Sequence, residues 1–191
     1  KGDFNKLSQA LNSLGKIDPN LNYMIKVHSG KYIENEPIYL NNLDNVSIIG
    51  DSSVNTEIEF NFLNIPDDGV FIHGNSGLLE NIKITFKTNE MFVDKVNIIK
   101  FVGKSVNLNN IKFDIESNNC DVINLNSCND VNYLKNIQIE GKYFFNKVDG
   151  ILNESFMGIN SDSSNLLELE NVSINLTPAN LFENIITNSS R

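Results

Sequence analysis

The chain has 191 residues, of which 40% are hydrophobic and 20% charged. This balance is typical of a folded protein and too apolar for a disordered one. The formal net charge is −9, and Arg191 is the only arginine. Since nucleic acids are bound largely through arginine and lysine contacts to phosphate, we expect no nucleic-acid partner. No apolar run approaches the roughly 18 residues that cross a bilayer, so the sequence predicts no membrane insertion.

Residues 3–15 are predicted to form a short amphipathic helix. Apolar side chains recur at Phe4, Leu7, Leu11 and Leu14, which is the spacing of one helical face. Asp3 can cap the start of this helix, and Gly15 can end it in the left-handed conformation.

The rest of the chain, residues 23–191, is predicted to form many short strands. Runs of Ile, Val and Phe alternate with turns rich in Asn, Ser, Gly and Asp, which indicates an all-β structure. Within this region one pattern occurs five times: Leu, any residue, Asn, Val or Ile, any residue, then Ile or Phe. The five copies begin at Leu43, Leu79, Leu108, Leu134 and Leu169. A constant motif with spacers of variable length predicts a solenoid in which each coil keeps one strand and turn.

Stacking the five copies predicts which side chains face inward, because side chains alternate along a strand. The inward columns are Val46, Ile82, Ile111, Ile137 and Val172, then Ile48, Ile84, Phe113, Ile139 and Ile174, then Gly50, Phe86, Ile115, Gly141 and Leu176. The asparagines of the motif are Asn45, Asn81, Asn110, Asn136 and Asn171. We expect them at a bend, where asparagine tolerates the left-handed conformation and stacked amides can form a ladder. Further strands are expected at residues 56–62, 69–73, 96–101, 121–126 and 150–153.

The chain resembles the pectin-lyase-like right-handed parallel β-helix superfamily. An amphipathic helix is followed by the strand Tyr23 to Val27, by HSGKY at His28 to Tyr32, which is similar to that family's PGTY turn, and by the repeat. The resemblance implies a single β-helix domain over residues 1–191, with a capping α-helix at 3–15 and coils at 23–191. It implies no particular chemistry, because the superfamily includes lyases, glycoside hydrolases, phage tailspikes and surface proteins on one scaffold.

The outward columns of the repeat hold the densest group of charged side chains. Asp114, Glu116 and Glu140 are predicted on adjacent coils about 4.8 Å apart. Lysines surround these carboxylates at Lys83, Lys112 and Lys142. Two carboxylates at this separation suit a retaining glycosidase, or part of a calcium site. A third interpretation is a solvated ladder of alternating charges that keeps the sheet soluble.

Aromatic residues between Gly141 and Leu166 offer a second candidate surface. Tyr143, Phe144 and Phe145 could stack on sugar rings from a projecting loop, or fold back as a small separate core. The candidate carbohydrate-binding residues are therefore Lys83, Lys112, Asp114, Glu140, Lys142 and Tyr143, and the weak catalytic candidates are Asp114, Glu116 and Glu140. No cofactor is expected, except a calcium ion if the carboxylates bind one.

The sequence favours a binding or structural module over an enzyme. Polygalacturonase-like motifs are limited to Asp67-Asp68 and His73-Gly74 at the wrong spacing, and the arginine base of pectate lyases has no counterpart. The leading hypothesis is a non-catalytic carbohydrate-recognising or structural module of a phage tail fibre, tailspike or bacterial surface protein. The alternative is a polysaccharide lyase or glycoside hydrolase.

Several further expectations follow from these hypotheses. The partner would be a polysaccharide or cell-surface glycan, the location a virion tail or cell surface, and the assembly a homotrimer of the tailspike kind. Because the chain starts at Lys1 without methionine, we expect it to be part of a longer protein. Cys120 and Cys128 flank a predicted strand and should be too far apart to form a disulfide.

Overall fold

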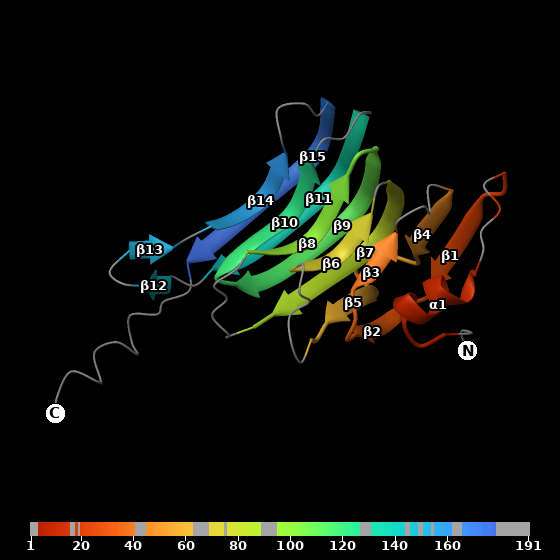
Figure 1. The fold of residues 1–191 in the computed structure, drawn as a ribbon, viewed down its shortest axis with the longest axis horizontal. Helices are drawn as coiled ribbons and strands as arrows, with labels where there is room; N and C mark the ends of the chain where they lie inside the picture. Colours follow the sequence, from red (N-terminus) through yellow and green to blue (C-terminus); the bar gives the residue numbers. More distant parts are fainter. Residues whose placement is uncertain are drawn as a thin grey trace.

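The computed structural model describes most of the chain. The described residues are 4–15, 18, 20–40, 45–62, 69–74, 76–88, 95–126, 131–143, 146–148, 151–153, 155–161 and 166–178, with only the backbone described at 146–148, 151–153 and 155. They form one helix, α1 (Leu7–Ser13), and parallel strands in two main sheets (Figure 1). No helix in this part of the chain is both long and apolar enough to span a bilayer.

The larger sheet has eight strands, and all of its pairings are parallel. They are β1 (Tyr23–Val27), β2 (Gly30–Glu34), β4 (Val46–Gly50), β5 (Thr56–Phe60), β7 (Gly77–Lys87), β9 (Val106–Ser117), β11 (Val131–Tyr143) and β15 (Leu166–Pro178). The second sheet has five parallel strands in the order β14-β10-β8-β6-β3. These are β3 (Ile38–Leu40), β6 (Val70–Gly74), β8 (Val96–Val102), β10 (Asn119–Asn126) and β14 (Ser155–Ser161).

The chain passes repeatedly from one sheet to the other. From β5 to β11 successive strands alternate between the two sheets, and each new strand pairs with the strand of the preceding coil. Before β14 the chain also forms an antiparallel hairpin of β12 (Asn146–Val148) and β13 (Ile151–Asn153). This arrangement confirms an all-β structure with parallel strands. A strand is present at 151–153, close to the expected range 150–153, but it belongs to the hairpin, and β14 is the strand of this coil that joins the second sheet.

The longest strands bend at the asparagines of the repeat. Asn81, Asn110, Asn136 and Asn171 have φ values of 58°, 53°, 54° and 59°. Each divides its strand into a segment before the bend and a segment after it, which we call the pre-bend arm and the post-bend arm. Two of the three steps between these asparagines have the predicted amide bond: Asn110 Nδ2 donates to Asn81 Oδ1 at 2.7 Å, and Asn171 Nδ2 donates to Asn136 Oδ1 at 3.0 Å. In the middle step Asn136 Nδ2 donates to Asn109 Oδ1 at 3.3 Å.

The first copy of the repeat, at residues 43–50, was assigned the wrong register. Ile48 pairs with Leu79 on the pre-bend arm, and Ile58 is the residue that pairs with Ile84. In this coil the two arms are separate strands, β4 and β5, joined by residues 51–55, where later coils have a single left-handed asparagine. Asn45 is therefore not part of the amide ladder, and its Nδ2 donates to the backbone oxygens of Asp18 and Leu21.

The other four copies of the motif have the predicted phase. The pairings Ile82 with Ile111 and Ile111 with Ile137 place these side chains in one column. The second and third columns follow the same register. The side chains of the first and second columns are fully buried in the first three of these coils: Ile82, Ile84, Ile111, Phe113, Ile137 and Ile139. In β15, the last strand in the order of its sheet, Val172 is only partly buried and Ile174 is 46% exposed.

Helix α1 packs on the first coil and is shorter than the predicted range 3–15. Leu7 and Leu11 join the buried core, and Gly15 has the expected positive φ of 60°. Asp3 lies outside the described residues, so its predicted capping role stays a prediction. The fully buried carboxylate of Glu34, from β2, accepts hydrogen bonds from Leu7 N at 2.5 Å, Ser8 N at 3.3 Å and Ser8 Oγ at 2.6 Å. A side chain from the sheet thus satisfies the free amides at the start of the helix.

Cys120 is fully buried in β10 and forms no disulfide, which agrees with the sequence prediction. Burial raises the pKa of its thiol well above the ordinary value, so the reactive thiolate form is disfavoured. Cys128 lies outside the described residues.

Candidate functional site

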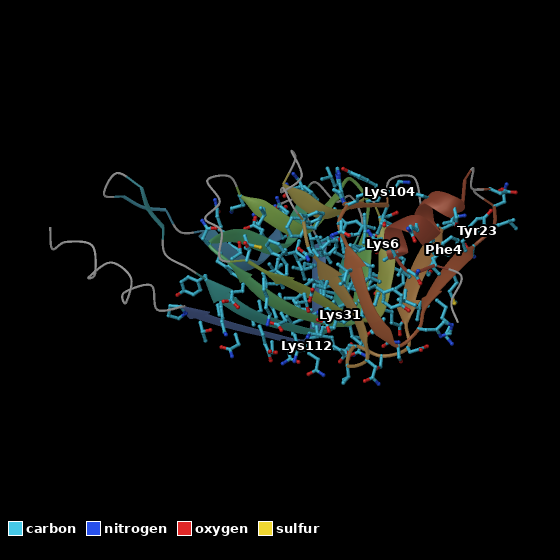
Figure 2. All side chains as sticks on the ribbon, turned by 90° about the horizontal axis from the view of Figure 1, so that it is seen from below. Phe4, Lys6, Tyr23, Lys31, Lys104 and Lys112 are labelled. Carbon is cyan, nitrogen blue, oxygen red and sulfur yellow. The ribbon has the colours of Figure 1, made fainter. Side chains whose placement is uncertain are left out.

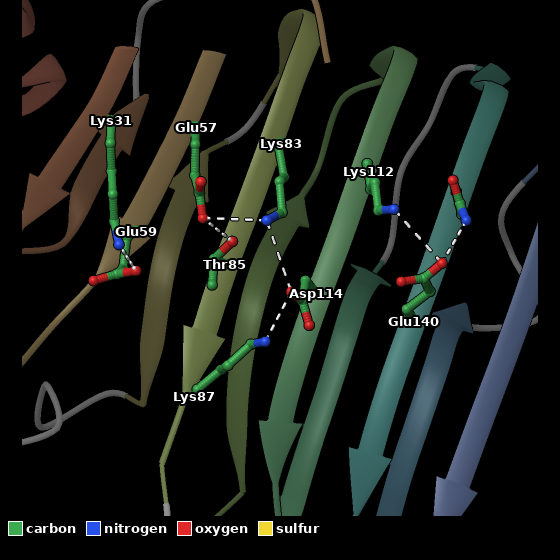
Figure 3. A network of polar contacts seen from close by, with 10 residues as sticks. Lys31, Glu57, Glu59, Lys83, Thr85, Lys87, Lys112, Asp114 and Glu140 are labelled. Carbon is green, nitrogen blue, oxygen red and sulfur yellow. Dashed lines mark hydrogen bonds and ion pairs between the residues drawn. The ribbon is translucent and has the colours of Figure 1, made fainter. Parts of the chain in front are cut away.

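The outer side of the post-bend arms carries three neighbouring groups of polar contacts, which together we call the charged ladder (Figure 3). It comprises Lys31, Glu57, Glu59, Lys83, Thr85, Lys87, Lys112, Asp114, Gln138 and Glu140. Two register rows build it, Glu57-Lys83-Lys112-Gln138 and Glu59-Thr85-Asp114-Glu140. Figure 2 shows Lys31 and Lys112 on the same side of the molecule, away from Phe4 beside α1.

Each predicted carboxylate of the ladder is engaged by lysine. Asp114 Oδ2 lies 2.9 Å from Lys87 Nζ and 3.7 Å from Lys83 Nζ. Lys83 Nζ also lies 3.3 Å from Glu57 Oε1, so it bridges two coils. Glu140 Oε1 lies 3.6 Å from Lys112 Nζ and accepts a hydrogen bond from Gln138 Nε2 at 2.6 Å. Opposite charges therefore pair across neighbouring strands, although Lys83 and Lys112, and Asp114 and Glu140, are register partners of like charge.

The electrostatics of the ladder favour the charged forms. Burial tends to raise the pKa of Glu57, but the hydrogen bond from Thr85 and the charge of Lys83 outweigh it and hold that pKa below 4.5. The hydrogen bond to Asp114 is the main reason that the pKa of Lys87 is raised above 10.5. A lowered carboxylate pKa and a raised lysine pKa are the shifts expected when the two groups form partly solvated ion pairs.

The structure brings together most of the predicted site residues. Asp114 and Glu140 are register partners on adjacent coils, with Lys83 and Lys112 beside them, as predicted. Glu116 pairs in register with Lys142. Glu57, Glu59 and Lys31 were not predicted, because the repeat was taken to begin with residues 43–50, whereas β5 is the strand that pairs with the post-bend arm of β7. Within the described residues, no group of three or more His, Cys, Asp or Glu side chains could hold a metal ion.

Tyr143 does not lie on the ladder surface with the other residues of the predicted binding set, and its role in binding stays a prediction. It follows Gly141 by two residues on an alternating strand, so it lies on the inner side. Its ring centroid is 6.2 Å from that of Phe156, which packs against the core. Phe144 and Phe145 lie outside the described residues.

A hollow surface lies on the outer side of the pre-bend arms, around Tyr133. Its volume is about 700 Å³, and it is lined by Asn107, Asn109, Tyr133, Leu134, Lys135, Glu168, Leu169 and Glu170. The Tyr133 side chain is 44% exposed. Lys135 Nζ lies 3.0 Å from Glu170 Oε2, which leaves Glu168 as the carboxylate in the hollow without an ion-pair partner among the described residues. An aromatic ring beside amide, ammonium and carboxylate groups can stack on and hydrogen-bond a polar ring.

Tyr133 belongs to a register row that crosses the stack. The pairings Ser47 with Leu78, Leu78 with Asn107, Asn107 with Tyr133 and Tyr133 with Glu168 are continuous, and Met24 pairs with Ser47. We call these six residues the outward row. Sequence reasoning missed it because the repeat motif begins one residue after Tyr133, and the strand preceding the motif was not recognised.

The outer side of the second sheet carries a buried polar cluster around Asp121. Asp121 is fully buried; its Oδ1 lies 3.0 Å from Lys95 Nζ, and its Oδ2 accepts from Asn160 at 2.7 Å and Asn124 at 3.2 Å. Because a buried carboxylate is costly unless it is paired and hydrogen-bonded, these contacts have a structural role. His73 in β6 lies near Tyr39, at 6.4 Å between ring centroids, whereas Asp67 and Asp68 are outside the described residues.

Comparisons with known proteins find no relative: no family model, no curated protein and no solved structure matches this chain. The candidate sites therefore rest on geometry and chemistry alone.

Proposed function

We propose that this chain is a non-catalytic carbohydrate-recognising module built on a closed right-handed parallel β-helix. The alternation of strands between two parallel sheets and the asparagine ladder support this fold. The right-handed sense is supported by the general rule that crossovers between parallel strands are right-handed in about 98% of cases.

The observation that carries the proposed function is the hollow around Tyr133. Its volume of about 700 Å³ is in the range of small-molecule sites. An exposed tyrosine offers an apolar face for the C–H groups of a sugar ring, and its hydroxyl remains available for hydrogen bonding. Asn107 and Glu168 place an amide and a carboxylate beside this ring, where they can bind sugar hydroxyls.

The same geometry favours binding over hydrolysis. A glycosidase needs two carboxyl side chains of its own on either side of the glycosidic bond, and one of them must be able to donate a proton. In the hollow Glu170 is paired with Lys135, and in the charged ladder both Asp114 and Glu140 are paired with lysines. Neither surface presents two unengaged carboxyl groups.

A glycan array, followed by affinity measurements on any glycan that binds, tests this function. Tyr133→Ala should lower affinity by at least about tenfold, the equivalent of 1.4 kcal/mol. Tyr39→Ala is a matched control, since Tyr39 is an exposed tyrosine in the second sheet. The double variant Asp114→Ala, Glu140→Ala should keep full binding. If the wild-type chain binds no glycan, the function is wrong; if the double variant alone loses binding, the charged ladder is the site.

A further inference from the structure

A second hollow lies on the same outer surface as the hollow around Tyr133. It has a volume of about 230 Å³, and its lining includes Ser47, Leu78, Ser105 and Asn107. Asn107 lines both hollows. Both also lie on the outward row, which continues from Ser47 through Leu78 and Asn107 to Tyr133. The two hollows therefore form one path across the strands.

The side chains along this path alternate in character. Met24, Leu78 and Tyr133 are apolar or aromatic, whereas Ser47, Asn107 and Glu168 are polar. Met24 is exposed, and Leu78 and Tyr133 are at least partly exposed. Neighbouring strands are about 4.8 Å apart, so apolar positions recur about every 9.6 Å. This repeat is comparable with two sugar residues of an extended β-linked hexose chain, in which successive rings turn over.

The charges around the path disfavour an anionic chain. Lys26 Nζ lies 3.5 Å from Asp51 Oδ1 and Lys135 Nζ lies 3.0 Å from Glu170 Oε2, so each of these lysines beside the row has a carboxylate partner. Glu168 lies on the row itself, and Glu80 lies beside it, where its Oε1 accepts a hydrogen bond from Asn109 Nδ2. A uronate polymer would meet these carboxylates without a free ammonium partner.

We propose that the ligand of this site is an extended, uncharged hexose oligosaccharide that lies across the strands along the outward row and contacts both hollows. This inference rests on the proposed function, because it assumes that the Tyr133 hollow binds sugar. It adds three properties of the ligand: the oligosaccharide runs across the strands, it is longer than two sugar residues, and it is uncharged.

Affinity as a function of chain length tests the proposal. The probes are β-1,4-linked gluco-oligosaccharides and manno-oligosaccharides of two and six residues, with oligogalacturonates of the same lengths as anionic probes. The hexasaccharide of one neutral series should bind at least about tenfold more tightly than its disaccharide and than hexagalacturonate. Equal affinity for two and six residues, tightest binding of galacturonate, or no binding of either neutral series would overturn the inference. In each of these cases the glycan array and the Tyr133→Ala variant still test the proposed function separately, because neither depends on the length or charge of the ligand.

A steric block of the smaller hollow gives the second test. Ser47→Trp should fill it and reduce hexasaccharide affinity to that of the disaccharide, while disaccharide binding is unchanged. Ser173→Trp is the matched control, because Ser173 is exposed on the post-bend arm of β15. If Ser47→Trp does not fold, Ser105→Trp takes its place, because Ser105 lines the smaller hollow and not the hollow around Tyr133. Full hexasaccharide affinity in a folded block variant would contradict the proposal.

Discussion

The asparagines at the bends show how one side chain can serve both conformation and packing. A positive φ is unfavourable for most residues, but asparagine tolerates it. Its amide can then bond the amide of the next coil, as Asn110 does with Asn81, and Asn110 Oδ1 also accepts a hydrogen bond from Ser53 Oγ at 2.9 Å. Asparagine therefore recurs at the same position of each motif with a bend because the bend needs both its left-handed backbone and its amide. Asparagines elsewhere in the described part of the chain do not have this combined role.

Substitution of Asn110 separates these two contributions. Asn110→Gly keeps the positive φ and loses the amide bonds, whereas Asn110→Ala loses the bonds and adds a conformational cost of about 1–2 kcal/mol. Thermal melts should therefore rank wild type above Asn110→Gly and Asn110→Gly above Asn110→Ala. Equal melting temperatures for the two variants would show that the backbone at this bend is not left-handed.

The charged ladder predicts a pH dependence that can be assigned to Glu57. The folded pKa of Glu57 is below the ordinary value, so its stabilising contribution is present above the unfolded pKa of about 4.5 and is lost as pH falls through the folded pKa. Partly exposed pairs of this kind contribute roughly 0.2–1 kcal/mol. Glu57→Gln should therefore lower the melting temperature by a few degrees at pH 7 and by less at pH 3. Glu168→Gln serves as the control, and an equal loss for Glu57→Gln at both pH values would contradict the assignment.

At the scale of elements, α1 depends on the sheet for its first turn. The sequence predicted the helix from the spacing of Leu7, Leu11 and Leu14, but it placed the cap at Asp3. Asp3 lies outside the described residues, but Glu34 from a distant strand accepts the amides of Leu7 and Ser8, which no local pattern could have indicated. Local periodicity predicts that an element exists, whereas its ends depend on tertiary partners.

Removal of the Glu34 carboxylate should release the start of α1. Glu34→Ala leaves Leu7 N and Ser8 N without buried acceptors, at a cost of about 1–3 kcal/mol. Urea unfolding should show this loss, and hydrogen exchange of the Leu7 and Ser8 amides should accelerate. Glu36→Ala, at an exposed position two residues away, should change neither quantity. Wild-type exchange rates in Glu34→Ala would mean that the cap is not formed.

The bends also explain which strands could be predicted. Four copies of the motif include a one-residue bend, so the phase of the post-bend arm follows directly from the sequence. In the second coil residues 51–55 replace that single residue, and β4, which contains the motif-like residues 46–50, lies on the other arm. A motif search could not distinguish the two arms, because both present alternating apolar residues to the same core.

At the scale of the whole molecule, the stack exposes several outer surfaces with different chemistry. The charged ladder could be predicted, since Lys83, Lys112, Asp114 and Glu140 follow the motif at fixed positions. The hollow around Tyr133 could not be predicted from the sequence, because its lining depends on which residues of three neighbouring strands are register partners. The single-domain organisation, the homotrimer and the virion or cell-surface location stay predictions.

The central claim is that the outward row around Tyr133 binds carbohydrate. The chain contains no tryptophan, so Tyr133→Trp places a unique fluorophore in the hollow while keeping an aromatic face. The decisive measurement is a fluorescence titration of this variant with a glycan that the wild-type chain binds on the array. The account predicts a saturable shift of the emission maximum to shorter wavelength, at the affinity measured independently, and no shift in Tyr39→Trp. Retained glycan binding by Tyr133→Trp without any change in emission would contradict it.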